Sequence, residues 1–338
     1  MHAYLIKRSL SSLLSILGVT FLVFTISHLV PADPVAVYLG PQATVGQVES
    51  LKEEWGLKKP VIVQYGIFIK NLVRGNLGFS MVSRKPVVDE LLYYFPATFE
   101  LTLVAMTFAI SMGLLIGIIS ALKRNRLIDH LARVYSIVGI SMPIFWLGLL
   151  LLLLFYVQLG WLPGGGRIDQ GIEVKHITGF LIADSILTRN WPGLWSCLAH
   201  LVLPGYCLAS AVLATIARIA RASVLQVLGE DFVQAARAKG ISEIKVIGKH
   251  VLKNSILPVI TISGVLYGQL LGGAVLTETI FSWPGMGRYV VRSILHLDFQ
   301  PIMGFTVLCA LLYAFFNLVV DILYSVINPQ IRFEQNRR

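Results

Sequence analysis

The stretch 101-LTLVAMTFAISMGLLIGIISAL-122 contains no Lys, Arg, Asp or Glu. About 20 consecutive apolar residues are enough for a helix to cross a bilayer. Only helices and closed barrels satisfy their own backbone hydrogen bonds in lipid. Barrel strands are about ten residues long and alternate apolar with polar positions, and this stretch does neither. It therefore predicts a transmembrane helix.

The rest of the chain repeats this pattern. Apolar residues make up 56% of the chain and charged residues 14%, whereas soluble domains carry about 25% charged residues. We therefore predict an all-α integral membrane protein. Its six predicted transmembrane helices are Ser9–Val30, Leu101–Leu122, Val134–Gly166, Trp191–Ala217, Asn254–Thr277 and Phe299–Val320. The first is longer than a signal-peptide core, so we interpret it as an uncleaved span.

The basic residues predict the orientation. The N-terminus and the segments 123–133, 218–253 and 332–338 together hold more than half of the Lys and Arg residues but few acids. The positive-inside rule places these segments, and both termini, in the cytoplasm. The net charge of +10 therefore reflects the orientation of the chain in the membrane. It does not indicate nucleic-acid binding, because aromatic residues do not interleave with the basic ones.

Three regions follow from the spans and loops. Residues 1–30 form the cytoplasmic N-terminus and first span, and residues 31–97 form an outer subdomain with helix start and stop signals such as Pro60, Gly75 and Pro86. Residues 98–338 form the transmembrane core, with a cytoplasmic loop at 218–253. A second outer loop, 164–195, contains a short apolar segment at 176–188 that we expect to form an interfacial helix.

The cytoplasmic loop contains the charged stretch 229-GEDFVQAARAKGISEIKVIGKH-250. Gly229 is expected to end the helix of span four, and Glu230 and Asp231 suit the first turn of a new helix. Gly240 is expected to end that helix in a left-handed cap.

Two further features of this stretch concern its faces and its second helix. Phe232, Ala235 and Ala236 are expected to share one narrow face, and Ser242 to start a second helix whose Ile244, Ile247 and Val251 share another. A face of small residues favours the close approach of a partner. The alternative, a helix lying on the membrane surface, would favour large apolar residues.

The charged stretch is also where the sequence resembles a known family. The segment 234-QAARAKG-240 is similar to the EAA loop of membrane subunits of binding-protein-dependent ABC importers, with Gln234 in place of the usual Glu. Along the whole chain, six ordered motifs resemble the dipeptide-permease branch of that family: LVPADPV, GFSMVSRKPV, SMPIFWLG, GEDFVQAARAKG, LTETIFSWPGMGR and DILYSVINPQIR. The Pro usual after the loop is absent from 250-HVLK-253.

The resemblance implies a function and partners. The fold would be that of a type I ABC importer, and the chain would form half of a path for dipeptides or short peptides. Its partners would be a homologous second permease subunit, two ATP-binding subunits, an extracytoplasmic substrate-binding protein and membrane lipid, in a bacterial or archaeal inner membrane. The coupling residues would be Glu230, Asp231, Phe232, Gln234, Ala235, Ala236, Lys239 and Gly240.

The chain itself is expected to hold no nucleotide and to be no enzyme. It lacks the G-x-x-x-x-G-K-[ST] loop that cradles phosphates, so ATP and Mg²⁺ would be bound by the partner subunits. None of the seven histidines has the i, i+4 spacing of a helical metal pair, and we predict no metal site. The three cysteines are interpreted as small buried hydrophobic residues.

Two acids flank the predicted spans. Counted at 1.5 Å per residue along their predicted spans, Glu278 lies near the outer mouth of the transmembrane path and Asp321 lies near its inner mouth. Glu278, Arg288 and Arg292 are the outer-mouth candidates, and Glu278 is expected to pair with one of the arginines or, as the alternative, to contact substrate. Docking of the binding protein is expected on 31–97 and on 283–292. Pro143 and Pro204 are interpreted as packing kinks, with gating as the alternative.

Other functions remain open. A permease for nickel complexes or for small solutes such as oligosaccharides is the alternative within the family. An ion-coupled secondary transporter would favour acids at mid-membrane and an inverted repeat, and the sequence shows neither. An intramembrane enzyme would need a nucleophile and base, which we do not find.

Overall fold

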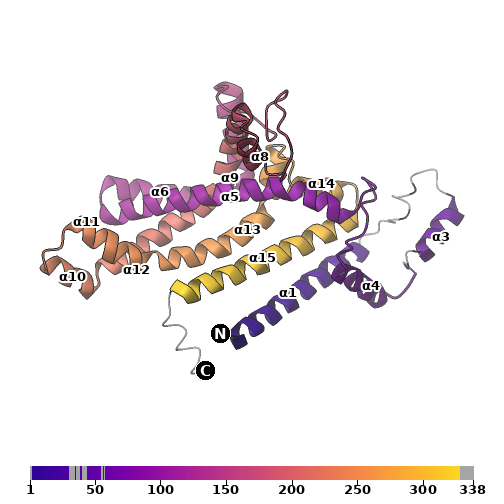
Figure 1. Cartoon of the computed structure of the whole chain (residues 1–338), viewed down its shortest axis with the longest axis horizontal. Coiled ribbons are helices and arrows are strands. Elements are labelled where there is room, and N and C mark those ends of the chain that lie inside the picture. Colours follow the sequence, from indigo (N-terminus) through magenta and orange to yellow (C-terminus); the bar gives the residue numbers. More distant parts are fainter. Residues whose placement is uncertain are drawn as a thin grey trace. The chain divides into compact units, whose positions relative to one another are not determined.

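A computed structural model of the chain describes residues 2–29, 35, 39, 44–54, 56 and 58–327 (Figure 1). In this part of the chain the regular structure is helical, and the single β-bridge joins Phe79 and Pro86. The prediction of an all-α protein is confirmed.

The chain divides into two compact units. The first comprises residues 1–98 and 284–312, and the second comprises residues 99–283 and 313–338. The described helices are α1 (His2–Leu29), α3 (Val45–Glu54), α4 (Val61–Val73), α5 (Val87–Leu122), α6 (Leu127–Ser141), α7 (Ile144–Leu151), η1 (Leu152–Gln158), α8 (Leu181–Leu187), α9 (Trp191–Leu228), α10 (Asp231–Ala238), α11 (Glu243–Lys245), η2 (Val246–Leu252), α12 (Lys253–Ser255), α13 (Leu257–Ile280), α14 (Met286–Leu295) and α15 (Phe299–Ile327).

In the first unit, aromatic side chains hold α4 against α1. The buried Phe24 ring lies 5.4 Å from the Tyr65 ring and 5.8 Å from the Phe68 ring. The Tyr65 hydroxyl donates a hydrogen bond to the Leu17 carbonyl at 3.0 Å. Pro60 precedes α4, and Gly56 and Gly75 take positive φ after α3 and α4, as the sequence predicts.

A turn at 78–86 ties the start of α5 to the α14–α15 connection in the same unit. The Ser80 hydroxyl and the Val82 amide donate to the buried Asp298 carboxylate at 2.6 and 3.1 Å. The Tyr289 hydroxyl donates to Glu90 on α5. Val87, Leu91, Met286 and Tyr289 form a buried apolar cluster beside these bonds. Hydrogen bonds and apolar packing thus fix α14 on the first turns of α5.

In the second unit, α9 is packed closely by α5 and α6. Gly113 and Gly117 on α5 have the G-x-x-x-G spacing that allows close helix approach in membranes. A Cβ on Gly117 would lie 2.6 Å from the Ala217 carbonyl oxygen, and one on Gly113 would lie 2.8 Å from Ile216. On the neighbouring α6, a Cβ on Gly139 would lie 3.0 Å from Ala214. A side chain at Gly117 would collide with the backbone of α9, and one at Gly113 or Gly139 would force its neighbour on α9 to shift.

The spans differ in detail from those predicted. Three described helices are long and apolar enough to cross a membrane, and two bent helix pairs raise this to five if each pair is one span. The apolar part of α1, Leu13–Leu29, is shorter than these helices. Each of the six runs lies largely on helices, but the predicted third span extends past the end of η1 at Gln158, and the runs do not form six straight spans.

The third predicted span is broken rather than straight. α6 ends at Ser141 and α7 begins at Ile144, with a bend of 108° between them. Pro143 explains the break, because proline lacks a backbone donor and disfavours helical backbone in the residue before it. Met142 accordingly has extended backbone (φ −77°, ψ 123°). Pro204, in contrast, lies inside the continuous α9.

Two long helices also extend beyond their predicted spans. α5 begins at Val87, so the boundary expected at residue 97 lies inside a helix that continues through Pro96. α9 continues to Leu228, eleven residues beyond the predicted end at Ala217.

The loop at 164–190, which belongs to the predicted outer loop 164–195, is held by two buried acids of the second unit. Glu100 on α5 accepts hydrogen bonds from Arg167 at 2.5 Å and from the Ile182 amide at 2.7 Å. Asp184 on α8 accepts three backbone N–H groups and one hydroxyl from residues 177–179 at 2.7–3.2 Å. The short helix expected within 176–188 is α8, and it is held by these bonds.

Candidate functional site

The candidate coupling site is built around α10, and the residues at both ends of this helix explain where it begins and ends. Glu230 is the residue before the helix, and Asp231 lies in its first turn, where negative charge favours the helix dipole. Gly240 has φ +74°, as predicted. The Gly240 amide donates to the Arg237 carbonyl at 2.9 Å and the Ile241 amide to the Ala236 carbonyl at 3.3 Å. This pair of bonds is the Schellman motif, which satisfies the last carbonyls of a helix.

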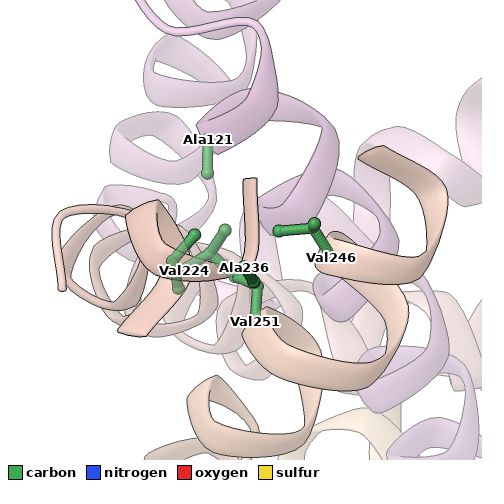
Figure 2. Packing of buried hydrophobic residues seen from close by; sticks show 6 residues of the cluster. Ala121, Val224, Ala236, Val246 and Val251 are labelled. Carbon is green, nitrogen blue, oxygen red and sulfur yellow. The ribbon is translucent and has the colours of Figure 1, made fainter. Parts of the chain in front are cut away.

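One face of α10 is anchored to the helices of the second unit. Val233 is fully buried and Ala236 is 6% exposed. They pack in one cluster with Ala121 at the end of α5 and Val224 near the end of α9. Figure 2 shows these side chains converging from different helices. Full burial of a valine side chain stabilises the packed state by about 1.5–3 kcal/mol.

The segment that follows α10 completes the anchor. Val246 and Val251 are fully buried in the same cluster. They lie five residues apart in η2, and a π-helix, with its i→i+5 hydrogen bonds, brings positions five apart onto one face. Nearby, the Ser223 hydroxyl of α9 donates to the Ser255 carbonyl of α12 at 2.8 Å.

The opposite side of α10 is open. Phe232 is 44% exposed, and Glu230, Asp231, Gln234, Ala235, Lys239 and Gly240 are all exposed. The face predicted for Phe232, Ala235 and Ala236 is therefore divided, because Ala236 turns inward beside Val233. The exposed residues, which we call the α10 outer face, present one aromatic ring and a small alanine to the surroundings.

The second predicted face is also divided. Ile244 is 84% exposed, whereas Val251 is buried and Ile247 lies between these extremes. The prediction assumed α-helical spacing through this segment. The π-turn changes the register, so that Val246 takes the inward position that Ile244 was expected to fill.

Two ion pairs that the sequence did not predict brace this region. Arg237 on α10 and Glu243 on α11 form a two-pronged pair, with Nη2–Oε1 at 2.6 Å and Nε–Oε2 at 3.2 Å. Asp129 at the start of α6 is fully buried and pairs with Arg221 of α9, with Nε–Oδ1 at 2.7 Å and Nη2–Oδ2 at 2.9 Å. The latter pair is 92 residues apart in sequence, so no local spacing could reveal it.

Asp129 also gathers the end of α5. The Ser120 hydroxyl donates to it at 2.6 Å and the Asn125 amide at 2.9 Å. The carboxylate is therefore satisfied by three segments at once, which offsets the cost of burying its charge. The helix ends that meet α10 are thus themselves tied together.

The outer-mouth candidates lie in different units. Glu278 is fully buried on α13 in the second unit, and its backbone carbonyl accepts the Trp283 amide at 2.8 Å. Arg288 and Arg292 are exposed residues of α14 in the first unit. The pairing of Glu278 with an arginine therefore stays a prediction. Asp321 lies on α15, and its side chain is outside the described part.

The remaining side chains of interest are placed as follows. Cys197 and Cys207 are buried free thiols, as predicted, and Cys309 is half-buried. Within residues 2–327, excluding the short gaps given above, no cluster of three His, Cys, Asp or Glu residues is arranged to hold a metal.

Comparison with known proteins defines the class. Residues 113–333 match the family described as binding-protein-dependent transport system inner membrane component, and residues 1–102 match the N-terminal family of the same membrane components. The chain belongs to this family. The fold agrees: the chain is similar to the methionine ABC transporter MetNI in an inward-facing conformation (TM-score 0.50, 16% identity, 70% of this chain and 96% of that one).

Individual relatives cover almost the entire chain. It is 42% identical to the dipeptide transport system permease protein DppB of Alkalihalophilus pseudofirmus (98% of this chain, 100% of the relative). It is 45% identical to the di/tripeptide transport system permease protein DppB of Pseudomonas aeruginosa (94% and 95%). It is 41% identical to the glutathione transport system permease protein GsiC of Escherichia coli O6:H1 (98% and 99%).

Together these findings establish the class of the molecule. It is a multi-pass membrane permease subunit of a binding-protein-dependent ABC importer, and not an enzyme. As a permease it works with ATPase, permease and binding-protein partners.

Proposed function

We propose that this chain forms half of the translocation path for dipeptides and other short peptides. Three relatives that align over nearly their whole length are named for dipeptide, di/tripeptide and glutathione transport. All three names refer to small peptides. Identity of 41–45% over the full length supports the same cargo class here.

The second half of the path would come from a homologous permease subunit. Two ATP-binding subunits would bind ATP and Mg²⁺ and seat the α10 outer face in a groove of their surface. A substrate-binding protein would deliver the peptide on the other side of the membrane. The observation that carries this mechanism is the two-sided character of α10: Val233 and Ala236 are buried in the chain's own core, while Phe232 and Ala235 are exposed.

The charge distribution supports an orientation. The 218–253 loop and both termini would face the cytoplasm, because the basic residues concentrate in these segments. A cysteine replacing Ala235 should be protected from a membrane-impermeant maleimide in intact cells, whereas one replacing Glu49 on α3 should be labelled. Labelling of the Ala235 position in intact cells would reverse the proposed orientation.

Uptake tests the cargo. In cells lacking this chain, restoring it should restore uptake of a labelled dipeptide, and unlabelled di- and tripeptides should compete. Nickel salts should not compete. Restored nickel uptake without dipeptide uptake would contradict the proposed cargo but not the family.

A bulky residue at α10 tests the coupling. Ala235→Trp should leave the chain in the membrane and leave ATP hydrolysis measurable, but reduce peptide uptake per ATP. Gly240→Val should act similarly, because the left-handed backbone there disfavours a branched side chain. Normal uptake per ATP in both variants would contradict the coupling role.

A further inference from the structure

A pocket of about 390 Å³ lies in the second unit beside the coupling site. Its walls come from the last turns of α5, the middle and end of α6 and the late part of α9, and they include Ile116, Arg133, Ile137, Ile140, Arg218 and Ala222. This volume is within the range of about 300–1,000 Å³ that is usual for small-molecule sites. The function proposed above does not use it.

The charge of the pocket is positive. Arg221 is committed to the buried Asp129, which leaves that pair neutral. Arg218 is exposed and, within the described part of the chain, has no ion pair or side-chain hydrogen bond. Arg133 is 44% exposed. Its Nη2 donates to His130 Nδ1 at 2.8 Å, and its Nε lies 3.8 Å from Asp129, beyond hydrogen-bond distance. The Arg218 guanidinium and the remaining N–H groups of Arg133 are therefore the groups available to an anion.

The hydroxyl groups of the pocket are less available than the arginines. The Ser120 hydroxyl donates to Asp129 at 2.6 Å and the Ser136 hydroxyl donates to the Ala132 carbonyl at 2.8 Å. Both of these protons are thus used inside the chain, which leaves Ser141 as the third hydroxyl of the lining. A ligand that needs many partners, such as a sugar or a peptide, would find few. A single anionic group fits better, because guanidinium groups bind phosphate oxygens with paired, charge-assisted bonds.

The rest of the pocket is apolar and opens onto an apolar rim. Ile137 is 67% exposed and Ile140 is exposed beside it. Both lie within the predicted third span, whereas Arg133 and Arg218 are the charged residues that directly adjoin the third and fourth predicted spans. The arginines thus mark the level of the membrane surface, and the isoleucines mark the level of the hydrocarbon.

This arrangement matches one molecule: an acidic phospholipid. We propose that the pocket binds the phosphodiester of an anionic phospholipid between Arg133 and Arg218, with an acyl chain along Ile116, Ile137 and Ile140. Basic pockets between transmembrane helices on the cytoplasmic side bind acidic headgroups in other membrane proteins. Because Arg221 and Asp129 tie the same helices to the cluster under α10, the bound lipid would brace the joint through which the coupling helix acts.

Native mass spectrometry of the assembled importer in detergent micelles tests the proposal. The probes are phosphatidylglycerol and phosphatidylcholine with identical acyl chains, which differ in headgroup charge. The wild-type complex should retain phosphatidylglycerol preferentially. Replacing both arginines (Arg133→Gln with Arg218→Gln) should weaken this retention by about 30-fold, at about 5-fold for each basic residue near an anionic headgroup.

Two further variants keep the test sharp. Lys123→Gln with Arg124→Gln removes the same charge from the adjoining loop without touching the pocket, and it should retain the lipid. Ala222→Trp changes an exposed lining residue and should exclude the lipid without removing any charge. A thermal melt of each variant identifies any that fails to fold.

Three results would overturn the proposal. The first is equal retention of phosphatidylcholine and phosphatidylglycerol by the wild type. The second is unchanged retention in the variant lacking Arg133 and Arg218. The third is a photo-crosslinker at Ala222 that captures the second permease subunit instead of lipid, which would assign the pocket to a subunit interface. Each leaves the cargo and the coupling role of α10 untouched.

Discussion

Removal of the side chain that anchors α10 is the perturbation that most clearly separates packing from partner contact. Val233→Ala deletes two methyl groups at a position with no solvent exposure. Each buried methyl contributes about 0.8 kcal/mol, and the cavity left behind raises the total to about 2.5 kcal/mol. The local opening of α10 should therefore become about 60-fold more frequent.

Hydrogen–deuterium exchange on the purified chain in detergent micelles measures this opening directly. The amides of α10 should exchange about 60-fold faster in Val233→Ala than in the wild type, while those of α9 change much less. Ile244→Ala is the matched control, because Ile244 belongs to the same loop but is 84% exposed. We expect that control to stay within about 0.5 kcal/mol of the wild type.

The result that would refute the reasoning is equal exchange of α10 in Val233→Ala and Ile244→Ala. It would mean that the packing of Val233 does not hold α10 in place, and that the cluster drawn in Figure 2 does not link α10 to the other helices.

Three further predictions concern the scaffold. Asp129→Asn should lower the free energy of unfolding by about 3–5 kcal/mol, because it breaks an ion pair whose carboxylate is fully buried and leaves the partly exposed Arg221 without its counter-ion; thermal melts should show no such loss for Arg124→Gln. Gly117→Ala should cost about 1–3 kcal/mol through overpacking, whereas Gly272→Ala, where an added Cβ meets nothing within 4 Å, should not destabilise. Although burial opposes it, hydrogen bonds from Thr178 and its neighbours lower the pKa of Asp184, so this carboxylate stabilises the 164–190 loop above its unfolded pKa of about 3.9. That contribution should disappear as pH falls through the depressed folded pKa, detected as faster amide exchange at 177–179, and Asp184→Asn should lack the transition.

Sequence alone was sufficient where one local property decides the structure. The absence of charge over about 20 residues identifies the apolar helices, and Gly240 has the positive φ that its position after α10 predicts. Pro143, interpreted from the sequence as a kink, lies at the break between α6 and α7, whereas Pro204, interpreted in the same way, lies inside the continuous α9. Each of these signals comes from a few adjacent residues and needs no partner elsewhere in the chain.

Sequence alone was insufficient where helical register or contacts between distant residues decide the structure. The π-turn at Val246–Leu252 exchanges the inward and outward positions around Ile244, and assuming 3.6 residues per turn misplaces them. Val233 and Ala236 are three residues apart, a spacing typical of one buried helix face. The eight-residue α10 is too short, however, for periodicity to distinguish its buried face from its exposed face.

Contacts between residues far apart in the chain could not be predicted from the sequence. The Asp129–Arg221 pair joins residues 92 positions apart, and the extension of α5 back to Val87 through Pro96 runs against the usual effect of proline within a helix. Three-dimensional packing, rather than local preference, decides both.

The central claim is that the α10 outer face contacts an ATP-binding subunit. A photo-activatable amino acid placed at Ala235 of the assembled importer tests it most directly, with the same residue placed at Leu295, an exposed apolar position on α14, as the control. The account predicts a cross-link from Ala235 to the ATP-binding subunit and none from Leu295. Cross-links from Ala235 to lipid alone, or to the binding protein, would contradict it.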